Sequence, residues 1–91
     1  MAKDFRGSSG SEQVVLDVRT QEEFAEAHVP NARNIPLREL AQRHAELGGK
    51  TTPIVIYCRS GARSATAANL LTSLGYSHIT DIGSMSNWRA R

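Results

Sequence analysis

The segment PIVIYCRSGARS, residues 53–64, decides the fold, because an apolar run leads directly into a polar turn that contains glycine. Residues 53–57 are apolar throughout and rich in β-branched side chains, which is typical of a strand covered on both faces in a parallel sheet. Residues 64–74 favour a helix, and Gly75 supplies its left-handed C-cap. The sequence therefore predicts a strand, a tight loop and a helix, with Cys58 at the carboxyl end of the strand.

The rest of the chain alternates in the same way between strand and helix patterns. Thr20 and Glu23 form a capping box that opens a helix reaching to about residue 28. Pro36 makes its strand a weak one, suited to a sheet edge. A helix over 38–47 would align Leu37, Leu40, Ala41, His44 and Leu47 along one stripe. The predicted strands are residues 14–18, 34–37, 53–57 and 78–82, and a brief final turn closes at Trp88.

This alternation predicts an α/β fold of three layers, in which a central, mostly parallel sheet of about four to five short strands is flanked by helices. We expect residues 1–11 to form a flexible N-terminal segment, because their glycines and serines offer no apolar face. Residues 12–91 would form one domain.

Composition excludes several classes of function. The 91 residues carry a net charge of only +2, and the basic residues are scattered, so neither nucleic acid nor a membrane is an expected partner. One cysteine forms no internal disulfide, and no His or Cys spacing resembles a metal site. We expect a cytoplasmic protein without cofactor or metal, most simply a monomer.

The loop after the central strand has the residues that a reactive thiol needs. A helix N-terminus, inward backbone N–H groups and nearby arginines each favour a thiolate at Cys58. Gly61 lets the backbone turn tightly, and Arg59 and Arg63 suit an oxyanion. Ser60 and Ser64 add hydroxyl donors. Cys58 is therefore the candidate nucleophile.

The loop resembles the active-site loop of the rhodanese family, with cysteine first, glycine fourth and arginine sixth. Two further blocks support the resemblance: LDVR at 16–19, continued by EEF at 22–24 and HVPNARNIPL at 28–37, and Gly83 with Trp88 in the closing turn. The resemblance implies a rhodanese-like fold and a thiosulfate sulfurtransferase. Cys58 would take a sulfane sulfur from a thiosulfate-like donor and hold it as a persulfide. It would then pass this sulfur to a thiophilic acceptor such as cyanide or a thiol. A protein is a further possible donor or acceptor. The substrate-binding residues would be Arg59, Ser60, Gly61, Ala62, Arg63 and Ser64.

The chain departs from the family pattern at turn positions. Ser84 stands where many relatives have a second glycine, and Ala27 and Asn31 occupy two other common glycine positions. Relatives also commonly begin with an additional strand and helix ahead of residue 14.

Two alternatives remain open at this point. The same loop serves a binding or sulfur-relay module that depends on a partner protein. Cysteine phosphatases and arsenate reductases also use a loop from cysteine to arginine, but they have five residues between the two where this chain has four. The smaller loop favours sulfur over a tetrahedral oxyanion.

Other polar residues have simpler interpretations. We expect Asp17 and Arg19 to form an ion pair at the end of the first strand, and His28 to bind the carbonyls at a helix end. Trp88 is expected to pack against the core. Arg63 could instead neutralise a surface carboxylate, although a position at a helix N-terminus favours a role in the loop.

Overall fold

A computed structural model describes residues 13–89, so the flexible segment expected over 1–11 lies outside the described residues. The elements, in order, are β1 (Val14–Asp17), α1 (Gln21–Glu26), β2 (Arg33–Asn34), α2 (Leu37–Arg43), the 3₁₀ helix η1 (His44–Leu47), β3 (Ile54–Cys58), α3 (Ala62–Ser73), β4 (Ile79–Ser84) and the 3₁₀ helix η2 (Met85–Asn87).

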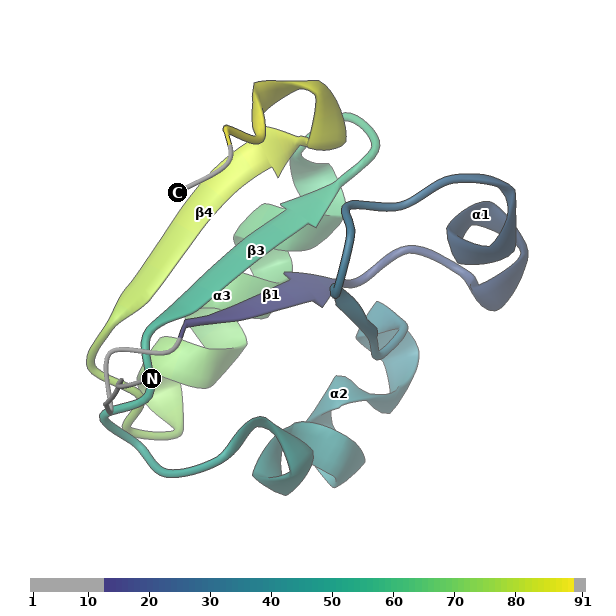
Figure 1. The fold of residues 1–91 in the computed structure, drawn as a ribbon. Coiled ribbons are helices and arrows are strands. Elements are labelled where there is room, and N and C mark those ends of the chain that lie inside the picture. The colour runs from purple at the N-terminus through teal and green to yellow at the C-terminus, as the bar shows by residue number, and fades with distance from the viewer. Residues whose placement is uncertain (1–12, 90–91) are drawn as a thin grey trace, which may run out of the picture.

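The four strands form one sheet in the order β2-β1-β3-β4, and each neighbouring pair is parallel. Helices α2 and α3 pack on one face, while α1 lies beyond the carboxyl ends of the strands (Figure 1). The predicted α/β class with a parallel sheet flanked by helices is confirmed. Every residue of β3 is buried, as its apolar run predicted.

The core is divided unequally between the two faces of the sheet. The larger cluster joins β1 and β3 to α2 and α3, with Leu16, Leu40, Ile56 and Leu71 at its centre. The smaller cluster, on Val15, Val29 and Tyr57, is closed by Trp88 from the C-terminal side. Trp88 thus packs against the core, as expected.

Three local expectations needed correction. The weak strand expected over 34–37 is Arg33–Asn34, since Pro36 has no N–H for the ladder and stands directly before α2. Helix α3 begins at Ala62 and not near Ser64, because Gly61 already serves as its N-cap. Ala41 is exposed and lies outside the predicted stripe, and the helix expected over 38–47 changes to 3₁₀ geometry from His44 onward.

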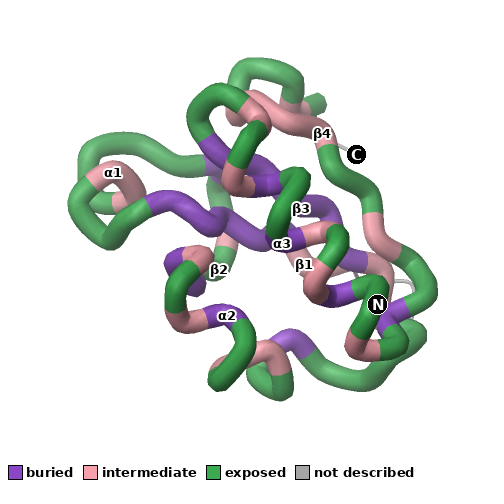
Figure 2. The backbone as a smooth tube through the Cα atoms, turned by 180° about the vertical axis from the view of Figure 1, so that it is seen from behind, coloured by how far each residue is buried: buried purple, intermediate pink, exposed green. Residues whose placement is uncertain are grey.

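Helix α1 is the element least integrated into the core. The predicted capping box is present, with Glu23 N donating to Thr20 Oγ1 at 3.1 Å and Thr20 N donating to Glu23 Oε1 at 2.8 Å. None of its six residues is buried (Figure 2). His28 Nδ1 lies 2.7 Å from the Phe24 carbonyl, so it binds a helix-end carbonyl as expected. Specific polar contacts, and not burial, must therefore hold α1 in place.

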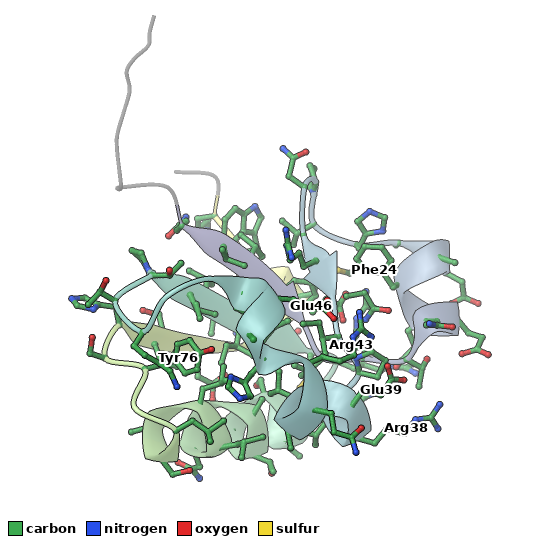
Figure 3. All side chains as sticks on the ribbon, turned by 90° about the horizontal axis from the view of Figure 1, so that it is seen from below. Phe24, Arg38, Glu39, Arg43, Glu46 and Tyr76 are labelled. Atoms are coloured by element: carbon green, nitrogen blue, oxygen red, sulfur yellow. The ribbon has the colours of Figure 1, made fainter. Side chains whose placement is uncertain are left out.

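The outer surface of α2 is covered by ion pairs. Arg43 contacts Glu39 at 2.7 Å and Glu46 at 2.8 Å, and the three side chains lie together in Figure 3. Such exposed pairs contribute little stability. No helix within residues 13–89 combines the length and apolarity needed to cross a membrane.

Leu71 is a direct test of the larger core cluster, because it is fully buried in α3. Leu71→Ala is expected to lower the free energy of unfolding by about 2–5 kcal/mol through lost burial and the cavity left behind. The adjacent exposed Thr72→Ala should change it by less than about 0.5 kcal/mol. Urea denaturation of both variants measures the difference, and equal effects would show that α3 does not pack as described.

Candidate functional site

The loop that follows β3 places its cysteine at the boundary between the sheet and helix α3. Cys58 is the last residue of β3, and Ala62 is the first of α3. Gly61 takes φ 107°, a conformation that L side chains rarely adopt. A Cβ at this position would lie 3.7 Å from the Gly83 Cα, an ordinary contact distance, so the backbone angle and not space requires glycine.

The sulfur of Cys58 lies inside the turn and accepts backbone hydrogen bonds. The Gly61 amide donates to Sγ at 2.9 Å and the Ser64 amide at 3.3 Å. The residue has no exposed surface and also contacts the larger core cluster. The thiol is therefore buried, but it is surrounded by polar donors on its loop side.

These contacts change the acidity of the thiol. Burial acts to raise the pKa of Cys58, but hydrogen bonds from the Ser64 hydroxyl and from the amides of Ser64, Gly61 and Ser60 outweigh it, and the net pKa lies below the ordinary value. The Ser64 hydroxyl donates to the Gly61 carbonyl at 3.0 Å, so its one hydrogen is already used there. We therefore attribute the lowered pKa mainly to the backbone amides.

Arg63 is directed at a carboxylate on α1. Its guanidinium binds Glu23 through two contacts, Nη1 to Oε1 at 2.8 Å and Nη2 to Oε2 at 3.1 Å. This pair and the capping bond from Thr20 together lower the pKa of Glu23 to about 2. The structure thus pairs Arg63 with a carboxylate, which was the less favoured of the two roles predicted for this residue from the sequence.

The remaining loop residues differ in exposure. Arg59, Ser60 and Ala62 are exposed, whereas Ser64 is fully buried. Arg59, the residue next to Cys58 in the chain, therefore has an exposed side chain that lines the smaller of two hollows described below. The six predicted substrate-binding residues occupy one continuous turn around Sγ.

The polar pair at the end of β1 is structural, as expected. Arg19 binds both carboxylate oxygens of the buried Asp17, the shortest contact being 2.7 Å. It also donates to the Ala27 carbonyl at 2.6 Å. Arg19 thus tethers the end of α1 to the end of β1, and Arg63 tethers α1 to the start of α3.

Two hollows open at this end of the molecule. The larger, about 430 Å³, lies between the start of α1, the start of α2 and Arg63. The smaller, about 310 Å³, adjoins the loop and is lined by Arg19, Glu23, Glu26, Arg59, Ser84, Met85 and Ser86. Cys58 does not line the smaller hollow, although two lining residues are its neighbours: Arg59 in the chain and Ser84 in the sheet register.

Sequence reasoning missed the contact between Glu23 and the loop residue Arg63. Glu23 was assigned only to the capping box, and its second role depends on the distant Arg63. The one available signal was that an arginine at the start of a helix requires a compensating anion. Within residues 13–89, no group of three or more His, Cys, Asp or Glu side chains is placed to hold a metal ion.

Comparisons with known proteins agree on one family. A family model described as Rhodanese-like domain matches residues 1–91. The thiosulfate sulfurtransferase PspE of Escherichia coli is 34% identical over 73 residues, which cover 79% of this chain and 70% of PspE. A solved structure described as a rhodanese with anions from E. coli has a TM-score of 0.81 and 31% identity, covering 88% of this chain and 95% of its own.

A further relative is a much larger protein. The adenylyltransferase and sulfurtransferase uba4 of Ogataea parapolymorpha is 37% identical over 75 residues. The match covers 81% of this chain but only 19% of uba4. A sequence of this kind therefore also occurs as a small part of a multifunctional protein.

The acidity of the thiol is directly measurable. Because its pKa is lowered, titration of thiolate ultraviolet absorbance should give a midpoint below the value of an ordinary cysteine, about 8.5. Ser64→Ala removes the hydroxyl and keeps the amide, so its midpoint should stay near that of the wild type. Cys58→Ser gives the baseline without thiol. A wild-type midpoint at or above the ordinary value would contradict the role of the amides.

The Arg63–Glu23 pair predicts a pH-dependent contribution to stability. Glu23→Gln keeps an oxygen for the Thr20 cap but loses the charge, so the free energy of unfolding near neutral pH should fall by about 1 kcal/mol. The folded pKa of Glu23 is depressed to about 2, so the wild-type advantage is present above its unfolded pKa, about 4.3, and is lost as pH falls towards 2. Denaturation curves across this range test the effect, with Glu22→Gln as the matched control. A difference that is independent of pH would argue against the ion pair.

Proposed function

This chain belongs to the rhodanese-like family, as its motifs predicted, and we propose that it moves a sulfane sulfur from a donor such as thiosulfate to a thiophilic acceptor through a persulfide on Cys58. The relatives support sulfurtransferase activity in general. The observation that supports a persulfide on Cys58 is the pair of backbone amides that donate to Sγ.

The first half of the reaction is a nucleophilic displacement at sulfur. The Cys58 thiolate attacks the outer sulfur of thiosulfate, a bond forms between the two sulfurs, and the sulfur–sulfur bond of thiosulfate breaks. The bonding electron pair leaves with sulfite. Charge is conserved, because a thiolate and a dianion become a persulfide anion and a sulfite dianion.

The loop would stabilise the persulfide anion by preorganised donors. Amides already aimed at Sγ require little reorganisation when negative charge moves to the outer sulfur. Ser60, Gly61, Ala62 and Ser64 contribute through the backbone of this turn. Arg59, which is exposed and follows Cys58 in the chain, is the residue that we propose binds the sulfonate end of the donor.

The loop must open for the reaction to occur. Cys58 has no exposed surface, so neither donor nor acceptor reaches Sγ in the conformation described. We propose that Arg63, held by Glu23, keeps the start of α3 and the loop amides in place while the exposed side chains of Arg59 and Ser60 move aside. Arg63 is on this account a positioning residue.

A second candidate function is sulfur relay between proteins. The similarity to part of uba4 favours it, because there the matching segment belongs to a larger protein. A relay domain would load faster from a persulfidated protein than from free thiosulfate. Comparing the two loading rates under equal concentrations distinguishes a small-molecule enzyme from a relay module.

The proposal predicts a change in mass. Incubation with thiosulfate should make the protein heavier by one sulfur atom, and cyanide should remove that sulfur as thiocyanate. Cys58→Ser keeps a side chain of similar shape and removes the only thiol in the chain, so both events should be abolished. Intact-protein mass spectrometry and a thiocyanate assay are the measurements. Thiocyanate production by Cys58→Ser would refute the assigned nucleophile.

A further inference from the structure

The turn at the end of β4 lies against the loop that holds the sulfur, and it carries an inference that rests on the function proposed above. Cys58 pairs with Ser84 in the sheet register, so the turn begins beside the end of β3 (Figure 1). A Cβ built on Gly83 would lie 3.9 Å from the Gly61 Cα, and one built on Gly61 would lie 3.7 Å from the Gly83 Cα. The backbones of the two glycines therefore face each other at close range.

Gly83 reaches this place because β4 contains a bulge. Ile56 pairs with Asp81, but Tyr57 pairs with Gly83. Ile82 is therefore one residue extra in β4, and the extra residue of a bulge is left unpaired while the ladder is locally disrupted. Gly83 takes φ 76°, a left-handed conformation that glycine adopts without strain. The pairing with β3 alone does not fix the backbone at this point.

Two exposed side chains hold the peptide group between Ile82 and Gly83. The Gly83 amide donates to Asp81 Oδ1 at 2.9 Å. The Ile82 carbonyl accepts from Asn87 Nδ2 at 2.8 Å. The amide and the carbonyl belong to one planar peptide group, so bonds at both of its ends fix its orientation.

Gly61 needs support from outside its own loop. It has no side chain, and its neighbours Ser60 and Ala62 are exposed. Within the loop, the Ser64 hydroxyl donates to the Gly61 carbonyl at 3.0 Å. On the other side, the backbone of Gly83 is the close neighbour. A shift of Gly83 would therefore give the Gly61 amide room to move away from the sulfur.

We propose that Asp81 and Asn87 are positioning residues for the reactive sulfur. By fixing the peptide group that precedes Gly83, they hold its backbone against Gly61, and the Gly61 amide stays directed at Cys58 Sγ. That amide makes the shorter of the two backbone contacts to the sulfur, at 2.9 Å. Neither Asp81 nor Asn87 lines either hollow, so both act through the backbone.

The charge of Asp81 makes the direction of the effect diagnostic. A carboxylate that acted only through its charge would disfavour the thiolate, so its removal would lower the titration midpoint of Cys58. Loss of the hydrogen bond to the Gly83 amide instead weakens the support of Gly61 and raises the midpoint. The two roles therefore predict shifts of opposite sign.

The test is titration of the Cys58 thiolate by ultraviolet absorbance in the absence of a donor. Asp81→Ala should raise the midpoint by about half a pH unit, because part of one hydrogen bond to the thiolate is lost. Asp81→Asn keeps an oxygen for the Gly83 amide, so its midpoint should lie at the wild-type value or slightly below it. Asn87→Ala breaks the other bond of the same peptide group and should also raise the midpoint.

The matched control is Thr80→Ala, which removes an exposed side chain of the same strand and neither bond of the bulge. Its midpoint should equal that of the wild type. The charged side chains around the loop, Arg59 and the pair of Arg63 with Glu23, are the same in every variant. A midpoint in Asp81→Ala that is unchanged or lower overturns the proposal, and so does an equal rise in Thr80→Ala.

Failure of the proposed function would give a different result. Sulfur loading from thiosulfate is followed by mass spectrometry across the same pH range, and its inflection should move with the thiolate midpoint in each variant. If thiosulfate loads no sulfur on wild-type Cys58, the proposed function fails, while a raised midpoint in Asp81→Ala still supports the positioning role. If sulfur is loaded but Asp81→Ala titrates like the wild type, only the positioning role fails.

Discussion

The contacts from the Gly61 and Ser64 amides to the Cys58 sulfur require the chain to turn within three residues between β3 and α3. That turn depends on a left-handed glycine at its end and on a rigid strand at its start. Burial of every residue in β3 supplies the rigid strand. The fully buried Ser64 and Leu71 hold α3 against the sheet. Much of the fold can therefore be understood as support for one polar pocket around a sulfur atom.

Burial and hydrogen bonding oppose each other at this atom. A thiol without exposed surface would ordinarily be harder to ionise, and the backbone donors more than compensate for that penalty. The result is a group that is both protected from solvent and prepared to carry negative charge. Burial of the sulfur suits a persulfide, because thiols in solution would otherwise remove its outer sulfur.

The charged residues around the loop are largely engaged with one another. Arg63 binds Glu23, and Arg19 binds both Asp17 and the Ala27 carbonyl, so two guanidinium groups join α1 to the start of α3 and to the end of β1. The net charge near the sulfur is consequently smaller than a loop with two arginines suggests.

Residues with a local signal were predicted well from the sequence. The apolar run of β3, the capping box at Thr20 and the ion pair at Asp17 depend on neighbours in the chain, and all three are present. Asn31 keeps a left-handed turn with φ 69°, which fits its place at a common glycine position. The Arg63–Glu23 pair spans forty residues of sequence, so the position of Arg63 at a helix start indicated a compensating anion but did not identify Glu23. The burial of the Cys58 sulfur was equally invisible, because exposure depends on how the loop closes.

A crystal structure of the protein after treatment with thiosulfate would test the central claim most directly. We predict density for a second sulfur bonded to Cys58 Sγ, lying inside the loop within hydrogen-bonding distance of the backbone amides of residues 60–64. An added sulfur that points away from these amides, or an unmodified thiol after treatment, would contradict the claim that the loop exists to hold a persulfide anion.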